Sequence, residues 1–167
     1  KDRYKYAQAA AIIFQDFCYR LHIPLMVYGH STSGDLVDLY SYVEYDAFHD
    51  LDRYRLADIQ ARNSNRDGAA LRYVGEHLLK RPERNKILIL VSDGYPSHTH
   101  YWGNEAEKDL RAFHSAFVRR GGLLIAAAIG DDKDAIHRIY GQSFMDITDL
   151  PTFPLHLTQY LKRHIRI

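Results

Sequence analysis

The sequence predicts an α/β domain built on a mostly parallel, doubly wound sheet with helices on both faces. Helix-like and strand-like segments alternate along the 167 residues, and two of the strand-like segments are apolar throughout. These segments are KILILV at residues 86–91 and LLIAAAIG at residues 123–130. Strands that are apolar on both faces are typical of a sheet covered by helices on each side, which gives a three-layer α/β fold.

The expected helices follow from apolar residues repeated at helical spacing. The first covers residues 7–21 and ends before Pro24, and residues 46–60 are polar and only weakly helical. The same spacing predicts four more helices, at residues 69–81, 104–120, 131–140 and 155–165. Each of them follows or precedes a strand-like segment, as the doubly wound class requires.

The other expected strands are shorter or more polar. Residues 25–30 and 36–45 are rich in β-branched and aromatic side chains, and residues 31–35, STSGD, have the composition of a turn. A last short strand is expected at residues 143–148. The chain shows no linker, repeat or low-complexity stretch, so we expect residues 1–167 to form a single domain.

Composition excludes several classes of function. The 22 Lys and Arg residues nearly balance the 21 Asp and Glu residues, so nothing favours nucleic acid or an anionic membrane as a partner. The one cysteine, Cys18, lies on an apolar helical stripe and is expected to be an inert buried thiol. No apolar run approaches the ~20 residues of a membrane span, and the expected location is the cytoplasm.

A carboxylate ends the most apolar strand. Asp93 follows residues 86–91 almost directly, at the end of the strand where α/β sheets bind ligands, and Gly94 then allows a sharp turn. A carboxylate at this place is costly to bury unless it is paired, hydrogen-bonded or bound to a cation. Two interpretations stay open: Asp93 is a ligand, or it caps backbone amides of its own turn.

A second polar segment, NSNRDGAAL at residues 63–71, is expected at the same edge of the sheet. Asn65 and Asp67 offer side-chain oxygen atoms, which suit Mg²⁺ or Mn²⁺. The alternative is local: Asp67 caps the helix that follows, and Asn65 shapes the turn.

These motifs carry a resemblance to a known family. The order LMVYGHSTSG, NSNRDGAALRYVGEHLLKRPERNKILILVSDGYPSH and LLIAAAIGDD resembles a von Willebrand factor A (VWA) domain over nearly the whole chain. More narrowly, it is similar to the VWA domains at the C-terminus of CobT-type cobaltochelatase subunits and of NorD-type nitric oxide reductase activation proteins. The resemblance implies a Rossmann-like sheet and a domain that is the C-terminal part of a longer protein.

The resemblance also implies a function. VWA domains hold a metal ion, usually Mg²⁺, in a metal-ion-dependent adhesion site (MIDAS), and a carboxylate from a partner protein fills its open position. By position, Asp93 matches the strand-end ligand, Asn65 matches a middle-loop position where many relatives have Thr, and Asp67 is a further contributor. The implied role is non-catalytic protein binding, with an AAA+ ATPase of the MoxR or chelatase type as partner, in metal insertion or metalloenzyme maturation.

The sequence departs from the family at its start. The Asp-x-Ser-x-Ser ligands would lie just before Lys1, at the end of a first strand that this chain lacks. We read HSTSG at residues 30–34 as a turn rather than as those ligands. Without a central strand, two apolar strand edges would be unpaired, and metal binding by this chain is expected to be weak or absent.

The loop after Asp93 is the candidate partner-binding segment. It contains five candidate side chains for contact with a partner: Tyr95, His98, His100, Tyr101 and Trp102. Exposed aromatic side chains of this kind are typical of protein interfaces. Two alternatives stay open, namely that the aromatic side chains pack over the sheet edge and that the His-x-His pair holds a transition metal.

Other function classes fit less well. The sequence has no Gly-x-Ser-x-Gly elbow and no phosphate-binding loop, and no pair of nucleophile and base can be named. The runner-up to the metal-dependent module is a metal-independent scaffold on the same fold with a degenerate site.

Overall fold

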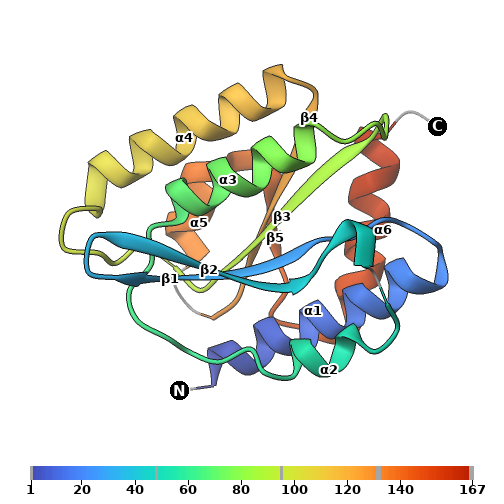
Figure 1. Ribbon diagram of the computed structural model, residues 1–167. Coiled ribbons are helices and arrows are strands. Elements are labelled where there is room, and N and C mark those ends of the chain that lie inside the picture. The colour runs from blue at the N-terminus through green and yellow to red at the C-terminus, as the bar shows by residue number, and fades with distance from the viewer. Residues whose placement is uncertain (1, 48, 95, 131–132, 166–167) are drawn as a thin grey trace.

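The computed structural model of the protein describes residues 2–47, 49–94, 96–130 and 133–165. Helices and strands alternate along this part of the chain (Figure 1). The helices are α1 (Arg3–Arg20), α2 (Asp52–Leu56), α3 (Asp67–Leu79), α4 (Gly103–Arg119), α5 (Lys133–Tyr140) and α6 (Phe153–His164). The strands are β1 (Val27–Ser33), β2 (Leu36–Val43), β3 (Lys86–Ser92), β4 (Gly122–Ala128) and β5 (Phe144–Asp146).

Three parallel strands form the centre of the molecule, in the order β3-β4-β5. Ser92 at the end of β3 is in register with Ala128 at the end of β4, so both strands end at one edge. The central strand β4 is fully buried, since its residues 124–128 are 0% exposed. The prediction of a mostly parallel sheet buried on both faces is confirmed.

Helices cover both faces of this sheet (Figure 1). Leu88 and Leu90 of β3 pack in one apolar cluster with residues of α3, α4 and α5. Ile125 and Ala127 of β4 pack in another cluster with residues of α1 and α6 on the opposite face. The strands alternate between the two clusters because successive side chains point to opposite faces. The result is the expected three-layer arrangement.

The hairpin of β1 and β2 differs from the prediction. Residues 31–33 continue β1 rather than forming a turn, and Ser33 pairs with Leu36. Thr32 explains the longer strand, because its backbone N–H donates to the carbonyl of Ser64 at 3.0 Å and its hydroxyl bonds to the same oxygen. The sequence STS is polar enough to resemble a turn, but a loop distant in sequence supplies the partners of a strand.

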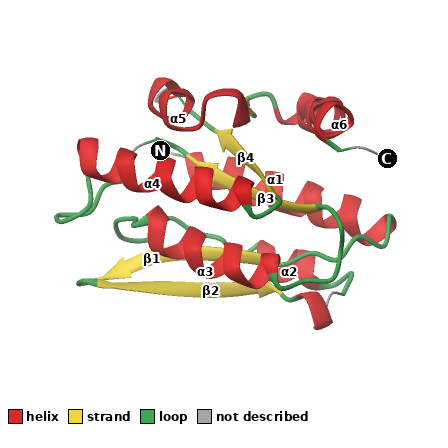
Figure 2. Ribbon diagram, turned by 90° about the horizontal axis from the view of Figure 1, so that it is seen from above, coloured by secondary structure: helices red, strands yellow, loops and turns green. Residues whose placement is uncertain are grey.

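The strands form two separate groups, as Figure 2 shows. The hairpin is a two-stranded sheet, and no ladder joins it to β3 in the described residues. A cavity of about 590 Å³, which we call the slot, lies between β1 and β3. Its walls include Val27, Gly29, Ile89, Val91, Ala7 and Ala70. The expectation of two unpaired apolar strand edges is therefore confirmed.

Two further expectations have a structural outcome. Cys18 is 1% exposed, and burial raises the pKa of its thiol to about 12, as an inert core cysteine requires. Among the described residues of the range 46–60, the only α-helix is α2, and a 3₁₀ turn at Tyr45–Ala47 precedes it. None of the described helices combines the length and the apolar character that crossing a membrane demands.

Candidate functional site

The side chains singled out from the sequence meet at the carboxyl edge of the sheet. Asp93 follows β3, and Asn65 and Asp67 lie where the chain enters α3. All three line the slot, and so does His30 of β1. This convergence follows from the parallel arrangement, because the carboxyl ends of parallel strands and the loops after them share one edge.

Asp93 lies at the rim of the slot and is half exposed. Its side chain is 51% exposed, and its Oδ2 lies 3.7 Å from Nη1 of Arg3 at the start of α1. The same guanidinium donates to the backbone carbonyl of Asp93 at 3.2 Å. This arrangement places a cation from α1 over the edge where β3 ends.

The turn after β3 uses Ser92 and Gly94. In the described residues the hydroxyl of Ser92, rather than the carboxylate of Asp93, makes the side-chain bonds of this turn, to the N–H and the carbonyl of Gly94. Gly94 has φ 153°, a conformation that other residues rarely adopt. The turn therefore needs Gly94 but leaves the Asp93 carboxylate outside its hydrogen bonding.

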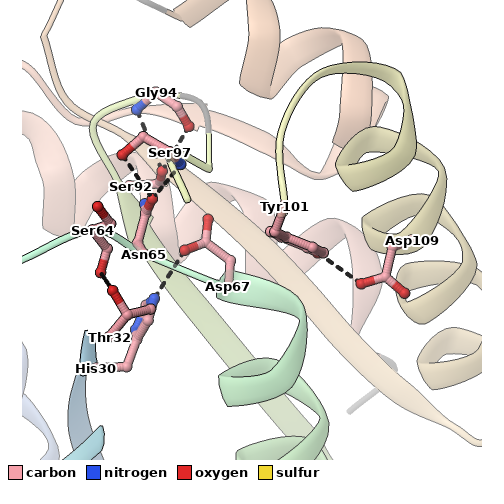
Figure 3. Close-up of polar contacts among 10 residues, drawn as sticks. All are labelled: His30, Thr32, Ser64, Asn65, Asp67, Ser92, Gly94, Ser97, Tyr101 and Asp109. Atoms are coloured by element: carbon pink, nitrogen blue, oxygen red, sulfur yellow. Dashed lines mark hydrogen bonds and ion pairs between the residues drawn. The ribbon is translucent and has the colours of Figure 1, made fainter. Parts of the chain in front are cut away.

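Asn65 joins the two polar loops. Its Oδ1 accepts a hydrogen bond from the backbone N–H of Ser97 at 2.7 Å, and Figure 3 shows the side chain directed at that loop. This contact links the start of α3 to the segment after β3, so Asn65 does more than shape its own turn. The hydroxyl of Ser97 donates to the same Oδ1 at 3.4 Å, so this amide oxygen accepts two hydrogen bonds from one residue of the loop.

Asp67 is the most buried of the predicted ligands, at 3% exposed. It is the first residue of α3, where the helix dipole favours a negative charge, and the N-cap position itself is held by Arg66. Its Oδ1 lies 2.8 Å from Nε2 of His30 (Figure 3). The side-chain partner of Asp67 in the described residues is therefore a histidine of β1, rather than a backbone amide of its own helix.

His30 is the site residue that sequence reasoning missed. The sequence places it at the end of a short strand and predicts a turn directly after it. The signal that could have found it is alternation: Tyr28 and His30 share one face of β1, and the ring of Tyr28 lies edge-on to Tyr73 of α3. The face of β1 that carries His30 is therefore turned toward α3.

Tyr101 packs inward rather than standing free in its loop. Its hydroxyl donates to Oδ2 of Asp109 at 2.7 Å, and Arg72 of α3 bonds to the same carboxylate. Burial and this hydrogen bond raise the pKa of Tyr101. Gly68 makes the contact possible, since a Cβ there would lie 2.4 Å from the Tyr101 hydroxyl. A larger residue at this glycine of the DGAAL motif would make the ends of the Tyr101, Asp109 and Arg72 side chains move.

The other loop residues divide between buried and exposed. His98 is 9% exposed, and its Nε2 bonds to the carbonyl of Gly34 at 2.9 Å, which ties the loop to the tip of the hairpin. Trp102 is 69% exposed and His100 is also exposed. Tyr95 lies outside the described residues. Of the described candidates, Trp102 and His100 are therefore the ones with exposed side chains.

The donor set has the right chemistry for a hard cation but is incomplete. Asn65, Asp67 and Asp93 supply oxygen atoms, the ligand type of Mg²⁺. Asp67 is paired with His30, and Asp93 faces Arg3. The described residues contain no group of three or more His, Cys, Asp or Glu side chains placed to hold a metal ion. These residues do not make a coordination sphere unaided.

Known structures share the fold of this chain. Proximal thread matrix protein 1 from the mussel byssus matches 95% of the chain with a TM-score of 0.65 and 17% identity, over 42% of its own length. A second structure of that protein, described with a zinc-occupied MIDAS motif, matches with a TM-score of 0.66 and 16% identity. At this level of identity the likeness concerns the fold alone.

Sequence comparison indicates the family. Protein NorD of Brucella melitensis biotype 1 is 27% identical over 107 residues, which cover 62% of this chain and 17% of NorD. Protein NorD of Brucella suis biovar 1 is 32% identical over 85 residues, covering 50% of this chain and 13% of NorD. The chain thus spans less than a fifth of these relatives. The family profile described as the cobalamin biosynthesis protein CobT VWA domain matches residues 54–165, so the chain belongs to the CobT VWA-domain family.

Proposed function

We propose that this domain is a non-catalytic module that docks a partner protein at the carboxyl edge of its sheet. The observation that carries the proposal is the convergence of Asn65, Asp67 and Asp93 on one cavity mouth, beside a loop that exposes Trp102. An exposed aromatic residue next to a polar centre is the usual composition of a binding hot spot. The convergence supports binding rather than chemistry, because the described serine hydroxyls at this edge bond to the Gly94 carbonyl and the Asn65 amide rather than to a general base.

A divalent cation is the second part of the proposal. Asn65, Asp67 and Asp93 would hold Mg²⁺ or Mn²⁺ together with ligands from outside the described residues, and the cation would offer an open position to a carboxylate of the partner. For Asp67 this means leaving His30, and for Asp93 it means turning from Arg3. The donor chemistry of the three side chains supports this assignment.

The partner and its setting are proposed from the family of this domain. We propose an AAA+ ATPase of the MoxR or chelatase type, acting with this domain in the cytoplasm during metal insertion or metalloenzyme maturation. The support is family membership and the match to NorD proteins.

A direct test measures thermal unfolding of the full-length protein with Mg²⁺, with Mn²⁺ and with EDTA. A cation that binds only the native state raises the midpoint, and at about a hundred times its Kd it stabilises by about 2.7 kcal/mol. We expect this rise in the wild type and its loss in Asp93→Ala. Recovery of the ATPase in a pull-down should fall with EDTA in the same way.

The matched control is Asp146→Ala, which removes a carboxylate from the end of β5, where it pairs with Lys133 at 2.6 Å. This variant should keep the metal-dependent rise. An equal midpoint with metal and with EDTA in the wild type would contradict the cation.

A metal-independent scaffold is the second candidate, and a specific observation favours it. Both carboxylates already face a basic side chain, His30 at Asp67 and Arg3 at Asp93. In that case the ATPase would bind equally with Mg²⁺ and EDTA, while Trp102→Ala would still weaken binding.

A further inference from the structure

The hairpin leaves the outer side of β2 open. β2 pairs with β1 along one side, and no other strand of the described structure pairs with its second side. Figure 2 shows β2 at the margin of the molecule, with no helix or strand outside it along most of its length. We call this side the free edge. It is separated from the slot by β1, and a second chain can approach it from solvent.

Three residues of β2 direct their backbone groups at the free edge. Thr32 of β1 turns its backbone away from β2, since its N–H and its carbonyl both bond to the loop before α3. In an antiparallel ladder, the residue opposite such a position also turns its N–H and C=O outward, and the pattern repeats at every second residue. Thr32 pairs with Val37, so the groups of Val37, Leu39 and Ser41 face outward.

β2 lacks the features that usually protect an edge strand. Natural sheets protect exposed edges with short strands, with Lys or Pro residues, or with a bulge. β2 has eight residues, contains no Lys, Arg or Pro, and keeps a regular register from Leu36 to Ser41. By contrast β5, at the edge of the parallel sheet, has only three residues. The free edge of β2 is therefore the strand edge that is suited to pairing with another chain.

The backbone of the free edge is complementary to a second copy of itself. We consider two β2 strands that run antiparallel about a two-fold axis at Leu39. This arrangement places Leu39 of one copy opposite Leu39 of the other, and Val37 opposite Ser41. Every outward N–H of the three residues then meets an outward C=O, as in a regular antiparallel ladder. No other position of the axis pairs all of these groups.

The charges beside the free edge fit the same arrangement. Asp38 is the one charged residue of β2, and Arg62 stacks over the ring of Tyr40 at 3.9 Å. Within the described residues neither Asp38 nor Arg62 has an ion pair. The two-fold arrangement sets Asp38 of one copy across from Tyr40 of the other, beside the guanidinium of Arg62. An axis at Asp38 would instead bring two carboxylates together, which is unfavourable.

We infer that the free edge of β2 is the surface through which two copies of this domain pair, strand to strand and antiparallel, about an axis at Leu39. The two hairpins then form one sheet in the order β1-β2-β2-β1. An isologous contact of this kind closes after two copies, so it gives a dimer rather than a fibre. It uses neither the carboxyl edge of the parallel sheet nor a cation, and it goes beyond the proposed function.

Hydrogen exchange in the full-length protein tests the surface directly. The amides of Val37, Leu39 and Ser41 should exchange at least about tenfold more slowly at concentrations where sedimentation shows a dimer than where it shows a monomer. The amides of Asp38 and Tyr40 face β1, so they serve as internal controls and should change less. A monomer at every concentration would overturn the inference, and so would a dimer in which the three amides keep their fast exchange.

Two charge-reversed variants test the register and the identity of the occupant. Asp38→Lys and Arg62→Glu each bring like charges together in a dimer of identical chains, and each should weaken that dimer at least about tenfold. An equal mixture of the two variants restores both pairs of opposite charge, so it should form a heterodimer about as tightly as the wild type. Asp149→Lys, at an exposed position away from the hairpin, should dimerise like the wild type.

The mixture gives the decisive result, because a change within one chain cannot be repaired by a second chain that lacks a matching surface. Thermal midpoints of the separate variants check that each is folded. Folded variants whose mixture dimerises no better than either variant alone would overturn the inference. Slow exchange of the three β2 amides that appears only on addition of a different protein would also overturn it, since the occupant would then be another chain.

Discussion

The parallel sheet and the hairpin are held in place by different forces. β4 is buried against apolar helices on both faces, and its position follows from packing alone. The hairpin shares an apolar cluster with α1 and α2, and it is joined to the rest of the described structure by polar contacts and by the edge-on packing of Tyr28 on Tyr73. The polar contacts are His30 with Asp67, Thr32 with Ser64, His98 with Gly34 and Arg66 with Asp35. A few hydrogen bonds therefore position the side of the site that the hairpin contributes, whereas packing positions the β3 side.

The largest expected effect concerns the parallel sheet, which packing holds in place. Leu124→Ala removes a side chain that is 0% exposed between the two helical layers, and should lower the free energy of unfolding by about 2–5 kcal/mol. Leu36→Ala in the hairpin is the matched control, since Leu36 is 72% exposed. It should change stability by less than about 0.5 kcal/mol. Urea unfolding measures both, and similar losses would show that the two halves do not differ as described.

The next effect concerns the contact between the halves. Asp67→Asn removes the charge that faces His30 in a site where the carboxylate is 4% exposed, and should cost about 1–3 kcal/mol. A double-mutant cycle with His30→Gln should give a coupling energy above about 0.5 kcal/mol. The same cycle on the exposed pair Glu76 and Arg120 should give a smaller coupling. Additive losses of stability in the His30 and Asp67 variants would show that this contact does not hold the two parts together.

A smaller effect is expected where the two polar loops meet. Asn65→Ala deprives the Ser97 amide of its acceptor, and should cost about 1 kcal/mol. The specific readout is faster hydrogen exchange at the Ser97 amide, with the amides of β4 unchanged. Asn104→Ala, at an exposed position in α4, serves as control. Unchanged exchange at Ser97 would mean that the loop is held by other contacts.

The smallest expected effect is a dependence of stability on pH, and it concerns α4 of the parallel part of the molecule. The hydrogen bond from Arg72 lowers the pKa of Asp109, with a further contribution from Tyr101. A carboxyl group whose pKa is lowered in the folded state stabilises the protein above its unfolded pKa of about 3.9, and this stability is lost as the pH falls. Because the pair is partly exposed, the loss should be below about 1 kcal/mol.

The measurement for this pair is the midpoint of thermal unfolding between about pH 5 and pH 2.5. The wild type should lose more stability over this interval than Arg72→Ala, in which the carboxylate has no guanidinium. Parallel curves for the two proteins would contradict the role of Arg72.

The sequence could predict much of the parallel half. The segments KILILV and LLIAAAIG are apolar at every position, and only a strand between two helical layers buries such a segment completely. The position of Asp93 after β3 and of Asn65 and Asp67 before α3 then placed all three at one edge. The hairpin was less predictable, because STS gains its strand conformation from bonds to residues 63 and 64.

The sequence by itself determined the fold class, the family and the edge at which the polar side chains gather, because periodicity and strand direction are local properties. Only the tertiary structure decided which partner each polar group has. His30 bonds to Asp67, Ser97 to Asn65 and Gly34 to His98. Each pair joins segments at least 32 residues apart in the sequence. Such partners depend on how packed elements meet in space, and no local pattern encodes that. The slot has the same origin, since it appears only when two strand edges face each other with no strand between them.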